Sequence, residues 1–444
     1  MTLTAGAASV VTTPPVGTPM EGYSARADVS QGVHDDLHAR ALVLDDAEGA
    51  VAVVACDLLG VDRRMVARAR QLAGDATGIA PERILIAGTH THSGPVVLAR
   101  DPDDPLLQVL AGHIAGAIAA AYRARRPAVL KAGSTTVASV SQNRRHPDWP
   151  VDTTLSILLL DDPDPASGAP PIAAAINFAC HATVLYHTNL LLSADYAGAA
   201  VRTVERVFPG VGALLLNGAC GNVNPAWIVQ DYSEAERVGA VVGAAAARLI
   251  GELRPLGPGQ RAHNIRWDEH IELPVSSGAL VPDVRLRAAS RRVELPVKTF
   301  LPQDEYDSTL RELEARLAAS PDRDERRRVM EPLSRLRTER TVASRMAGRD
   351  RPISAELQAI GLGEGLALLG LPGEFFVETV ADIRQRSGLR HLPVACYANH
   401  YVGYVVPPAA YDEGGYESGV TWLAPEAEGI VKHDALSLLR EVAG

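Results

Sequence analysis

The sequence predicts an α/β fold in which mixed β-sheets are flanked by helices. Short apolar segments of strand length alternate with segments whose apolar residues recur every three or four positions, as in an amphipathic helix. Several strand-like segments also follow one another without a helix between them, which favours mixed sheets over a regular βα barrel. Residues 302–348 differ from the rest because they are charged and helical, and we predict that they form an inserted helical hairpin.

The first 160 residues are expected to hold six strands and two helices. Turn residues such as Pro14, Pro15 and Gly17 predict that residues 1–35 are mostly loop. Apolar runs predict strands at residues 40–46, 50–56, 84–88, 128–132, 135–140 and 154–160. Helical periodicity predicts helices at residues 62–74 and 104–123.

The rest of the chain continues this alternation. Apolar runs predict strands at residues 172–179, 211–217, 354–360, 365–371 and 393–399, with further β structure in 262–300, where HIELPV and RRVELPV alternate. Helices are expected at residues 196–208, 233–252 and 375–386, and from about residue 425 onward. Ser233 and Glu236 have the spacing of a capping box. The hairpin, broken near Ser320 and Pro321, is a candidate lid or oligomer arm, although a solvated surface hairpin is more usual.

Composition is that of an ordinary globular protein. The 444 residues are 47% apolar and 22% charged, with no long linker or repeat, so we predict one domain over residues 1–444 with the 302–348 insertion. The formal net charge is −10 and no basic stripe stands out, which argues against a nucleic-acid partner. A small-molecule substrate is expected instead, and the 302–348 hairpin offers a surface for homo-oligomerisation.

A cytoplasmic protein without a membrane span is expected. The N-terminal residues have neither a basic region nor a long apolar core, and no stretch approaches the roughly 20 apolar residues of a membrane span. The four cysteines lie in apolar, strand-like settings without CxxC spacing, so we expect buried small hydrophobic residues, not disulfides or zinc thiolates.

Polar residues stand at the ends of several predicted buried strands. These residues are His90, His92, His181, the loop 217–225, Glu374 and the segment Tyr401 to Tyr404. In an extended backbone, His90 and His92 would point to the same side, because residues two apart share a face. In open α/β sheets, strand ends are where ligands and chemistry collect.

Each of these positions also has an ordinary structural explanation. The histidines and the glycine-rich turn are compatible with plain loops, and Glu374 in a first helical turn could complement the helix dipole. The same dipole role is favoured for Asp195 over a role as a metal ligand. Arg144 and Arg145 form a loop pair that is more often solvated than directed into a site.

Nitrogen and oxygen ligands that converge without a thiolate suit a catalytic Zn²⁺ with an open coordination position. Such an ion lowers the pKa of bound water to about 7 and polarises a carbonyl group. If the strand ends converge, the sequence therefore predicts hydrolase chemistry.

Six segments resemble motifs of the neutral/alkaline ceramidase family, in that family's order and over most of the chain. They are GTHTHSGP at 88–95, NFACHATVL at 177–185, SADYAGAA at 193–200, NGACGNVNP at 217–225, LPGEF at 371–375 and YVGY at 401–404. The resemblance implies the fold of that family's catalytic domain and a zinc ion. The zinc ligands that it implies are His90, His181, Glu374 and Tyr404.

The resemblance also implies roles for residues around the metal. His92 resembles a histidine that handles protons at the site, and Arg144 resembles an arginine of a segment that holds substrate. Tyr416, in GGYESG, is similar to a tyrosine that supports the oxyanion.

One departure from the family pattern changes the expected mechanism. The loop that matches GNVNP carries an essential serine in the ceramidases, and here that position is Asn224. An amide side chain is not an acyl acceptor, so attack by metal-activated water is expected, with Asn224 orienting substrate or water. The ceramidases also carry an immunoglobulin-like domain and usually a secretion signal, neither of which is recognised here.

The resulting hypothesis is a zinc-dependent hydrolase that cleaves a linear or cyclic amide of a small soluble substrate. The alternatives are a ceramidase-type enzyme acting on lipid, an esterase or lactonase, and a degenerate zinc-binding homologue without activity. A barrel amidohydrolase, which also carries an HxH motif, is ranked lower because too many predicted strands are consecutive.

Overall fold

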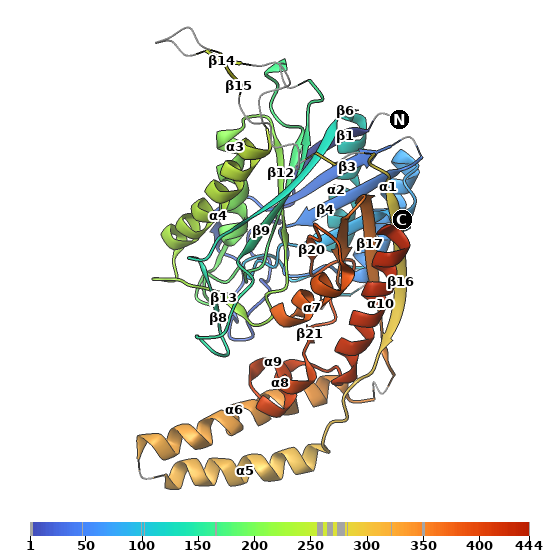
Figure 1. Cartoon of the computed structure of the whole chain (residues 1–444). Helices are drawn as coiled ribbons and strands as arrows, with labels where there is room; N and C mark the ends of the chain where they lie inside the picture. Colours follow the sequence, from blue (N-terminus) through green and yellow to red (C-terminus); the bar gives the residue numbers. More distant parts are fainter. Residues whose placement is uncertain are drawn as a thin grey trace.

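Three β-sheets share one central core in this computed structural model, and helices cover their outer faces (Figure 1). The structure describes residues 3–443, apart from residues 47, 99, 102, 165–166, 255–260, 264–269, 273–279, 282, 321 and 349–350. This arrangement is the predicted α/β class with mixed sheets and an inserted hairpin. The predicted HIELPV strand and the hairpin break at Pro321 fall partly outside the described residues.

The first sheet is built from the N-terminal residues. Its strands run in the order β5 (Ile84–Gly88), β4 (Ala50–Cys56), β3 (His38–Asp45), β1 (Thr4–Val11) and β6 (Arg126–Pro127). Strands β4 and β5 are parallel, and the other pairs are antiparallel. Helices α1 (Arg63–Thr77) and α2 (Pro105–Arg123) pack together, and α2 packs on β1 and β3. Among the described helices, α2 alone has the length and composition of a membrane span, but half of that segment is buried, as in a core helix.

The second sheet has the order β12 (Gly212–Asn217), β10 (Ala173–Phe178), β9 (Thr154–Asp161) and β7 (Val129–Thr136). Strands β10 and β12 are parallel, and the other pairs are antiparallel. Helices α3 (Asp195–Val207) and α4 (Tyr232–Leu253) pack against it and against each other.

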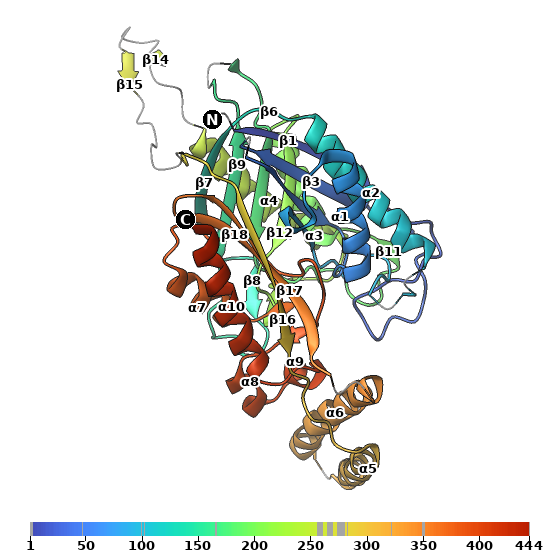
Figure 2. The ribbon, with the colours of Figure 1, turned by 90° about the vertical axis from the view of Figure 1, so that its right-hand side faces the viewer.

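The third sheet has the order β16 (Arg287–Leu295), β17 (Ile353–Gly363), β18 (Leu366–Gly370) and β20 (Val394–Ala395). Only its last pair, β18 and β20, is parallel. Helix α10 (Glu426–Ala443) packs along β16 and β17, with α7 (Val377–Ser387) beside it (Figure 2). Each of the three sheets therefore contains one parallel pair, whose two strands end on the same side.

Short elements connect the sheets. They are β2 (Gly32–Val33), η1 (Pro81–Arg83), β8 (Ser141–Asn143), β11 (Leu191–Leu192), β13 (Val223–Pro225), β14 (Arg261–His263), β15 (His270–Glu272), β19 (Glu374–Phe375), β21 (Tyr404–Val405), α8 (Pro408–Glu413) and α9 (Tyr416–Val420). Two pairings matter for the site: β8 pairs with β13, and β19 pairs in parallel with β21.

The central core consists of aliphatic residues from all three sheets. Val53 of the first sheet, Leu214 of the second and Leu368 of the third belong to one buried cluster. Burial of a side chain of this size contributes roughly 1.5–3 kcal/mol, so the shared core holds the three sheets in fixed relative positions. All four cysteines are buried and free, which confirms that they are small core residues.

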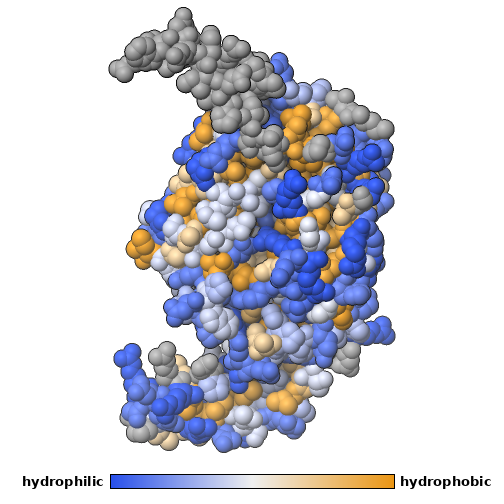
Figure 3. All heavy atoms as spheres, viewed as in Figure 1, coloured by the Kyte–Doolittle hydropathy of each residue, from blue (hydrophilic) through white to orange (hydrophobic). Residues whose placement is uncertain are grey.

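The inserted hairpin consists of α5 (Gln303–Ala319) and α6 (Arg323–Met346) and projects from one end of the molecule (Figure 1). Ion pairs cross between its helices, from Arg337 to Glu314 and from Arg340 to Asp307, both at 2.6 Å. Its free end is mostly hydrophilic (Figure 3). The middle of α6, around Arg335, in contrast, packs on α9.

Residues 1–35 are mostly loop, as predicted, but β1 at residues 4–11 was not predicted, because its small Ala, Gly and Ser side chains gave no strand pattern. Two other local predictions were wrong. The separate strands predicted at 128–132 and 135–140 are replaced by one strand, β7, which ends at Thr136. Helix α4 is capped by Asp231, which accepts a hydrogen bond from the Glu234 amide, instead of by Ser233 with Glu236.

The tight contact between α3 and α4 leads to a stability prediction. A Cβ at Gly239 of α4 would lie 2.4 Å from Ala199 Cβ and 2.7 Å from Tyr196 O of α3. Because the main chain of α3 cannot rotate away, Gly239→Ala is expected to lower the free energy of unfolding by about 1–3 kcal/mol. Urea unfolding followed by circular dichroism measures this change.

Gly251→Ala is the matched control on the same helix. No described atom lies within 4 Å of a Cβ placed there, so this substitution is expected to leave stability unchanged or to raise it by up to about 1 kcal/mol. Equal changes in the two variants would contradict the packing argument.

Candidate active site

The parallel strands of the three sheets end near one another, and the predicted polar residues follow them. His90 comes two residues after β5, His181 three residues after β10, and Glu374 four residues after β18. All three side chains are buried. The prediction that these strand ends carry one site is therefore supported by the geometry described next.

The nitrogen and oxygen atoms of these side chains face one another. Glu374 Oε2 lies 3.1 Å from His181 Nε2 and 3.4 Å from His90 Nε2. His92 Nε2 lies 3.2 Å from His90 Nε2. The ligand nitrogens of the three histidines all lie within 4.8 Å of one another, which is the spacing of a group that could hold a metal ion.

The backbone fixes which ring nitrogen carries the proton. His90 Nδ1 lies 2.7 Å from the Leu59 carbonyl oxygen, and His181 Nδ1 lies 2.9 Å from the Val223 carbonyl oxygen. A carbonyl only accepts, so each Nδ1 is the donor, and in a neutral ring Nε2 then holds a lone pair. In that form, lone pairs of His90, His181 and Glu374 point at one another, an arrangement that a shared cation would stabilise.

The separations fit a metal ion. Zinc–nitrogen and zinc–oxygen bonds of about 2.0–2.2 Å in a tetrahedron place ligand atoms roughly 3.3 Å apart. The two separations from Glu374 Oε2, 3.1 Å to His181 Nε2 and 3.4 Å to His90 Nε2, match this value. Carbonyl oxygens on the outer nitrogens are the usual support of metal-binding histidines.

The protonation states also suit a cation. Burial lowers the pKa of His181 to about 4, and burial together with the neighbouring imidazoles lowers the pKa of His92 well below its usual value. Burial alone would raise the pKa of Glu374, but its contacts with His90 and His181 outweigh that effect and lower it. Neutral imidazoles beside an ionised carboxylate are the forms that bind metal.

The HTH segment is not extended, in contrast to the expectation. His90 has a φ of 66°, in the left-handed region, so His90 and His92 meet through a turn and not along a strand. The His90 ring stacks on Tyr397 at a centroid distance of 3.9 Å, and His92 packs against Gly22, where a Cβ would lie 2.7 Å from Nδ1. Packing on both sides compensates for a strained backbone of this kind.

Asn217 is a supporting residue whose role was not predicted. Its side-chain nitrogen donates to the carbonyls of Thr89 and Cys180, at 3.1 and 3.0 Å, and so joins the residues that precede His90 and His181. It is fully buried at the end of β12. The sequence signal for this supporting role is a polar residue at the end of an apolar strand.

Asp195 has the structural role that was favoured for it. It begins α3, and its carboxylate accepts hydrogen bonds from the Leu185 and Tyr196 amides at 2.9 and 2.6 Å. These bonds fix the loop after His181.

Tyr401 and Tyr404 approach the Glu374 side of the site. Tyr401 OH donates to Glu374 Oε1, which orients the carboxylate. Tyr404 is paired with Glu374 in the β19–β21 ladder, and its phenol oxygen accepts from Arg144 Nη2 at 2.9 Å. Burial raises the pKa of Tyr404 well above its usual value, although Arg144 acts in the opposite direction. The role of Tyr404 as a ligand stays a prediction.

Arg144 is held almost entirely by protein groups. Its Nε donates to Glu417 at 2.7 Å and its Nη2 to the Gly221 carbonyl at 2.6 Å, while Nη1 lies 3.5 Å from Asn224 Oδ1. Arg145 donates to the other oxygen of Glu417 at 2.7 Å. Glu417, which was not predicted as a site residue, therefore anchors both arginines.

Tyr416 and Asn224 lie at the edge of this group. The Tyr416 ring is 6.0 Å from the Tyr404 ring and 62% exposed. Asn224 lies on β13, which pairs with the strand that precedes Arg144. The structure gives the positions of Tyr416, Asn224, Arg144 and His92, and their catalytic roles stay predictions.

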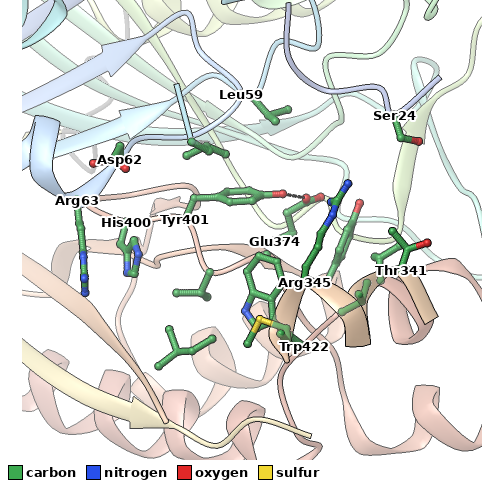
Figure 4. A pocket seen from close by; sticks show the side chains of 18 of the residues that line it. Ser24, Leu59, Asp62, Arg63, Thr341, Arg345, Glu374, His400, Tyr401 and Trp422 are labelled. Atoms are coloured by element: carbon green, nitrogen blue, oxygen red, sulfur yellow. Dashed lines mark hydrogen bonds between the residues drawn. The ribbon is translucent and has the colours of Figure 1, made fainter. Parts of the chain in front are cut away.

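A cavity of about 1190 Å³ opens onto the site. His92, Glu374, Tyr401, Tyr404 and Tyr416 line its inner part. The residues of α6 that line it are Thr338, Thr341, Val342, Arg345 and Met346 (Figure 4). The hairpin therefore forms a wall of the cavity in addition to its solvated surface.

Comparisons with known proteins agree with the resemblance seen in the sequence. A family model described as "Neutral/alkaline non-lysosomal ceramidase, N-terminal" matches residues 3–220. A neutral ceramidase from Pseudomonas aeruginosa is 24% identical over 466 aligned residues, which cover 91% of this chain and 67% of that protein. Neutral ceramidase A from Dictyostelium discoideum is 27% identical over 46% of this chain and 32% of its own length.

Solved structures show the same fold. The crystal structure of neutral ceramidase from Pseudomonas aeruginosa matches with a TM-score of 0.74 and 20% identity, over 99% of this chain and 74% of that one. A structure described as ceramidase complexed with C2 matches with a TM-score of 0.73 and 19% identity, over 99% and 76% of the two chains.

Proposed function

Because this chain belongs to the neutral/alkaline ceramidase family, a family of hydrolases, we propose that it is a zinc-dependent hydrolase that cleaves the C–N bond of a small amide or cyclic amide. The observation that carries the proposal is the meeting of unprotonated nitrogen and oxygen atoms from His90, His181 and Glu374 at 3.1–3.4 Å. A bound cation would stabilise such a group, because neutral imidazoles and an ionised carboxylate are the forms that ligate metal.

His90, His181 and Glu374 would hold the zinc ion, with Tyr404 as the fourth ligand. The ion would supply Lewis acidity toward the substrate carbonyl and toward water. The side chains of His90, His181 and Glu374 are buried, which strengthens the electrostatic interactions among them.

The other residues would position substrate and move protons. His92 lines the cavity, and burial with the neighbouring imidazoles lowers its pKa well below the usual value, so its neutral ring can take a proton from water and return it to the leaving nitrogen. Arg144 holds the Tyr404 phenol in place. Tyr416, at the cavity wall, is placed to donate to the carbonyl oxygen as it becomes negative.

Asn224 decides the identity of the acyl acceptor. A carboxamide is not a nucleophile, so no acyl-enzyme forms at this position and water accepts the acyl group directly. Asn224 Oδ1 faces Arg144 Nη1 at 3.5 Å, which leaves its NH₂ group to orient substrate or water.

A lipid amide is the second candidate substrate. The relative that aligns with 91% of this chain is named a neutral ceramidase, and part of the cavity wall is apolar, including Val342, Met346 and Trp422. A hydrolysis screen separates the two: short acyl amides and lactams against long-chain ceramides, with matched esters and lactones as a third set.

The test pairs this screen with metal analysis. We expect about one zinc per chain, and we expect His92→Ala to retain the metal while kcat falls about 100- to 10,000-fold, as for loss of a proton-transfer group. Loss of zinc in His92→Ala would instead make His92 a ligand. A purified protein without metal and without turnover of any substrate set would contradict the proposal and favour a degenerate homologue.

A further inference from the structure

We propose that Arg345, carried by the inserted hairpin, binds an anionic group of the substrate, so that the preferred substrates are amides that bear a carboxylate. This inference rests on the proposed function and refines its substrate class. It starts from the charges that line the cavity.

The cavity contains more positive charge than its carboxylates balance. Its charged lining residues are Asp62, Arg63, Arg64, Arg345, Arg351 and Glu374. Arg64 is paired with Asp62 at 2.8 Å, and Glu374 faces the metal ligands. Within the described part of the chain, Arg63, Arg345 and Arg351 form no ion pair. A concave site with excess charge of one sign concentrates ligands of the opposite sign.

This local excess contrasts with the whole molecule. The chain has a formal net charge of −10, whereas four arginines and two carboxylates line this cavity. Exposed arginines without an ion pair among the described residues also occur elsewhere on the hairpin, as at Arg311 and Arg326, so it is the position of Arg345 in the cavity lining that distinguishes it.

Arg345 is an unpaired arginine on the reactive side of the cavity. Figure 4 shows its side chain reaching from α6 into the cavity on the side that holds Glu374, whereas Arg63 lies on the other side next to His400. A guanidinium group presents parallel N–H donors that match a carboxylate in bidentate geometry.

Arg144 is not available to bind an anionic group of the substrate. Its guanidinium already donates hydrogen bonds to three protein residues, Glu417, Gly221 and Tyr404. An anionic substituent on the substrate therefore needs a different cation, and Arg345 is the cavity arginine without a described protein partner on that side.

The hairpin is fixed well enough to place Arg345. Helix α6 packs on α9, the element that begins with Tyr416, and the Arg335 side chain lies against Gly414 and Gly419. The crossing pairs of Arg337 and Arg340 hold α6 to α5. Because α6 and α9 contact each other, the anion site and the Tyr416 phenol have a defined spacing, as substrate recognition requires.

The mixed lining narrows the substrate class further. Apolar Val342 and Met346 flank Arg345 on the cavity side of α6. A substrate with a short aliphatic part and a carboxylate complements this wall, as in an N-acyl amino acid or the monoamide of a dicarboxylic acid. In an N-acyl amino acid the carboxylate lies on the amine half of the substrate. In the monoamide of a dicarboxylic acid it lies on the acyl half.

The experiment compares substrates that differ only in charge. N-hexanoylglycine is paired with N-hexanoylglycinamide, and adipic acid mono-ethylamide is paired with hexanoyl ethylamide. The quantity measured is the ratio of kcat/KM for the acid to kcat/KM for its neutral partner. We expect a ratio above about 10 in at least one pair, and the pair that shows it locates the carboxylate.

Arg345→Ala is expected to lower that ratio by about 10- to 100-fold, as for loss of a hydrogen-bonded charge pair, and Arg345→Lys is expected to lower it less. Arg326→Gln is the control, because Arg326 is exposed on the same helix and lies outside the cavity lining. Higher salt should reduce the wild-type ratio more than that of Arg345→Ala.

A binding measurement separates this inference from the proposed function. Calorimetry of N-hexanoylglycine and N-hexanoylglycinamide on the wild-type protein and Arg345→Ala, in chelator, needs no turnover. If no substrate is hydrolysed but the acid binds more tightly through Arg345, the function proposal fails and the anion site stands. If the amides are hydrolysed but the ratio is near 1, or is unchanged in Arg345→Ala, the anion site is wrong.

Discussion

Replacing His181 with alanine is expected to remove the bound metal and to lower kcat/KM by more than about 100-fold. The ring contributes the Nε2 atom 3.1 Å from Glu374 Oε2, and its Nδ1 proton is fixed on the Val223 carbonyl. Loss of a residue that only supports a metal ligand already costs up to about 100-fold in affinity or activity, so loss of a ligand should cost more. Elemental analysis of the purified variant and initial rates on the best amide measure the two effects.

His433→Ala is the control for this experiment. His433 is exposed on α10, outside the candidate site, and its loss should change neither metal content nor rate. Circular dichroism and a thermal melt of both variants establish that they are folded. A folded His181→Ala protein that keeps one zinc per chain and full activity would remove the proposed metal centre.

Much of the fold was predictable because its strands are buried on both faces. A strand such as β4 or β12 is a continuous apolar run, which sequence patterns identify well. Strand β1 was not predicted, because its side chains are small and form no continuous apolar run. Close packing requires these small residues: at Gly6, a Cβ would lie 2.3 Å from the Ala121 carbonyl oxygen. A close approach between distant segments leaves no local pattern.

The site was predictable where a polar residue follows such a run. His90, His181 and Glu374 were all identified in this way, and the structure brings them into contact. The left-handed backbone at His90 was not predictable, because only a few per cent of non-glycine residues adopt it and the stacked Tyr397 ring that supports it comes from about 300 residues later.

The supporting residues were missed because their partners are distant in sequence. Asn217 forms hydrogen bonds with two loops that follow strands of different sheets. Glu417 accepts a hydrogen bond from Arg144, which lies 273 positions earlier in the sequence. Their chemistry, a buried amide and a buried carboxylate, becomes informative only when the partners are known. Proton transfer and metal binding depend on such residues to hold ligand side chains in one geometry.

Glu417→Ala is expected to lower the free energy of unfolding by about 3–5 kcal/mol and to reduce activity at the same time. The Glu417 side chain is 3% exposed, and its two oxygens accept from Arg144 and Arg145 at 2.7 Å each. Removing one member of a buried charge group leaves the others uncompensated, which costs about that much. Arg144 would also lose the bond that directs it toward Tyr404 and Asn224, so kcat should fall even at temperatures where the variant is folded.

Glu413→Ala separates the effect of burial from the effect of charge. Glu413 also accepts from Arg145, at 2.9 Å, but its side chain is 38% exposed, and pairs of this kind contribute at most about 1 kcal/mol. Urea unfolding and steady-state kinetics of the two variants therefore should differ sharply. Glu417→Gln, which keeps the shape and loses the charge, should lie between them, because one amide oxygen can still accept from Arg144 while its NH₂ group faces Arg145 as a second donor. Similar small losses in all three variants would mean that Arg144 is held without Glu417, and that the arginine pair has no part in placing Tyr404.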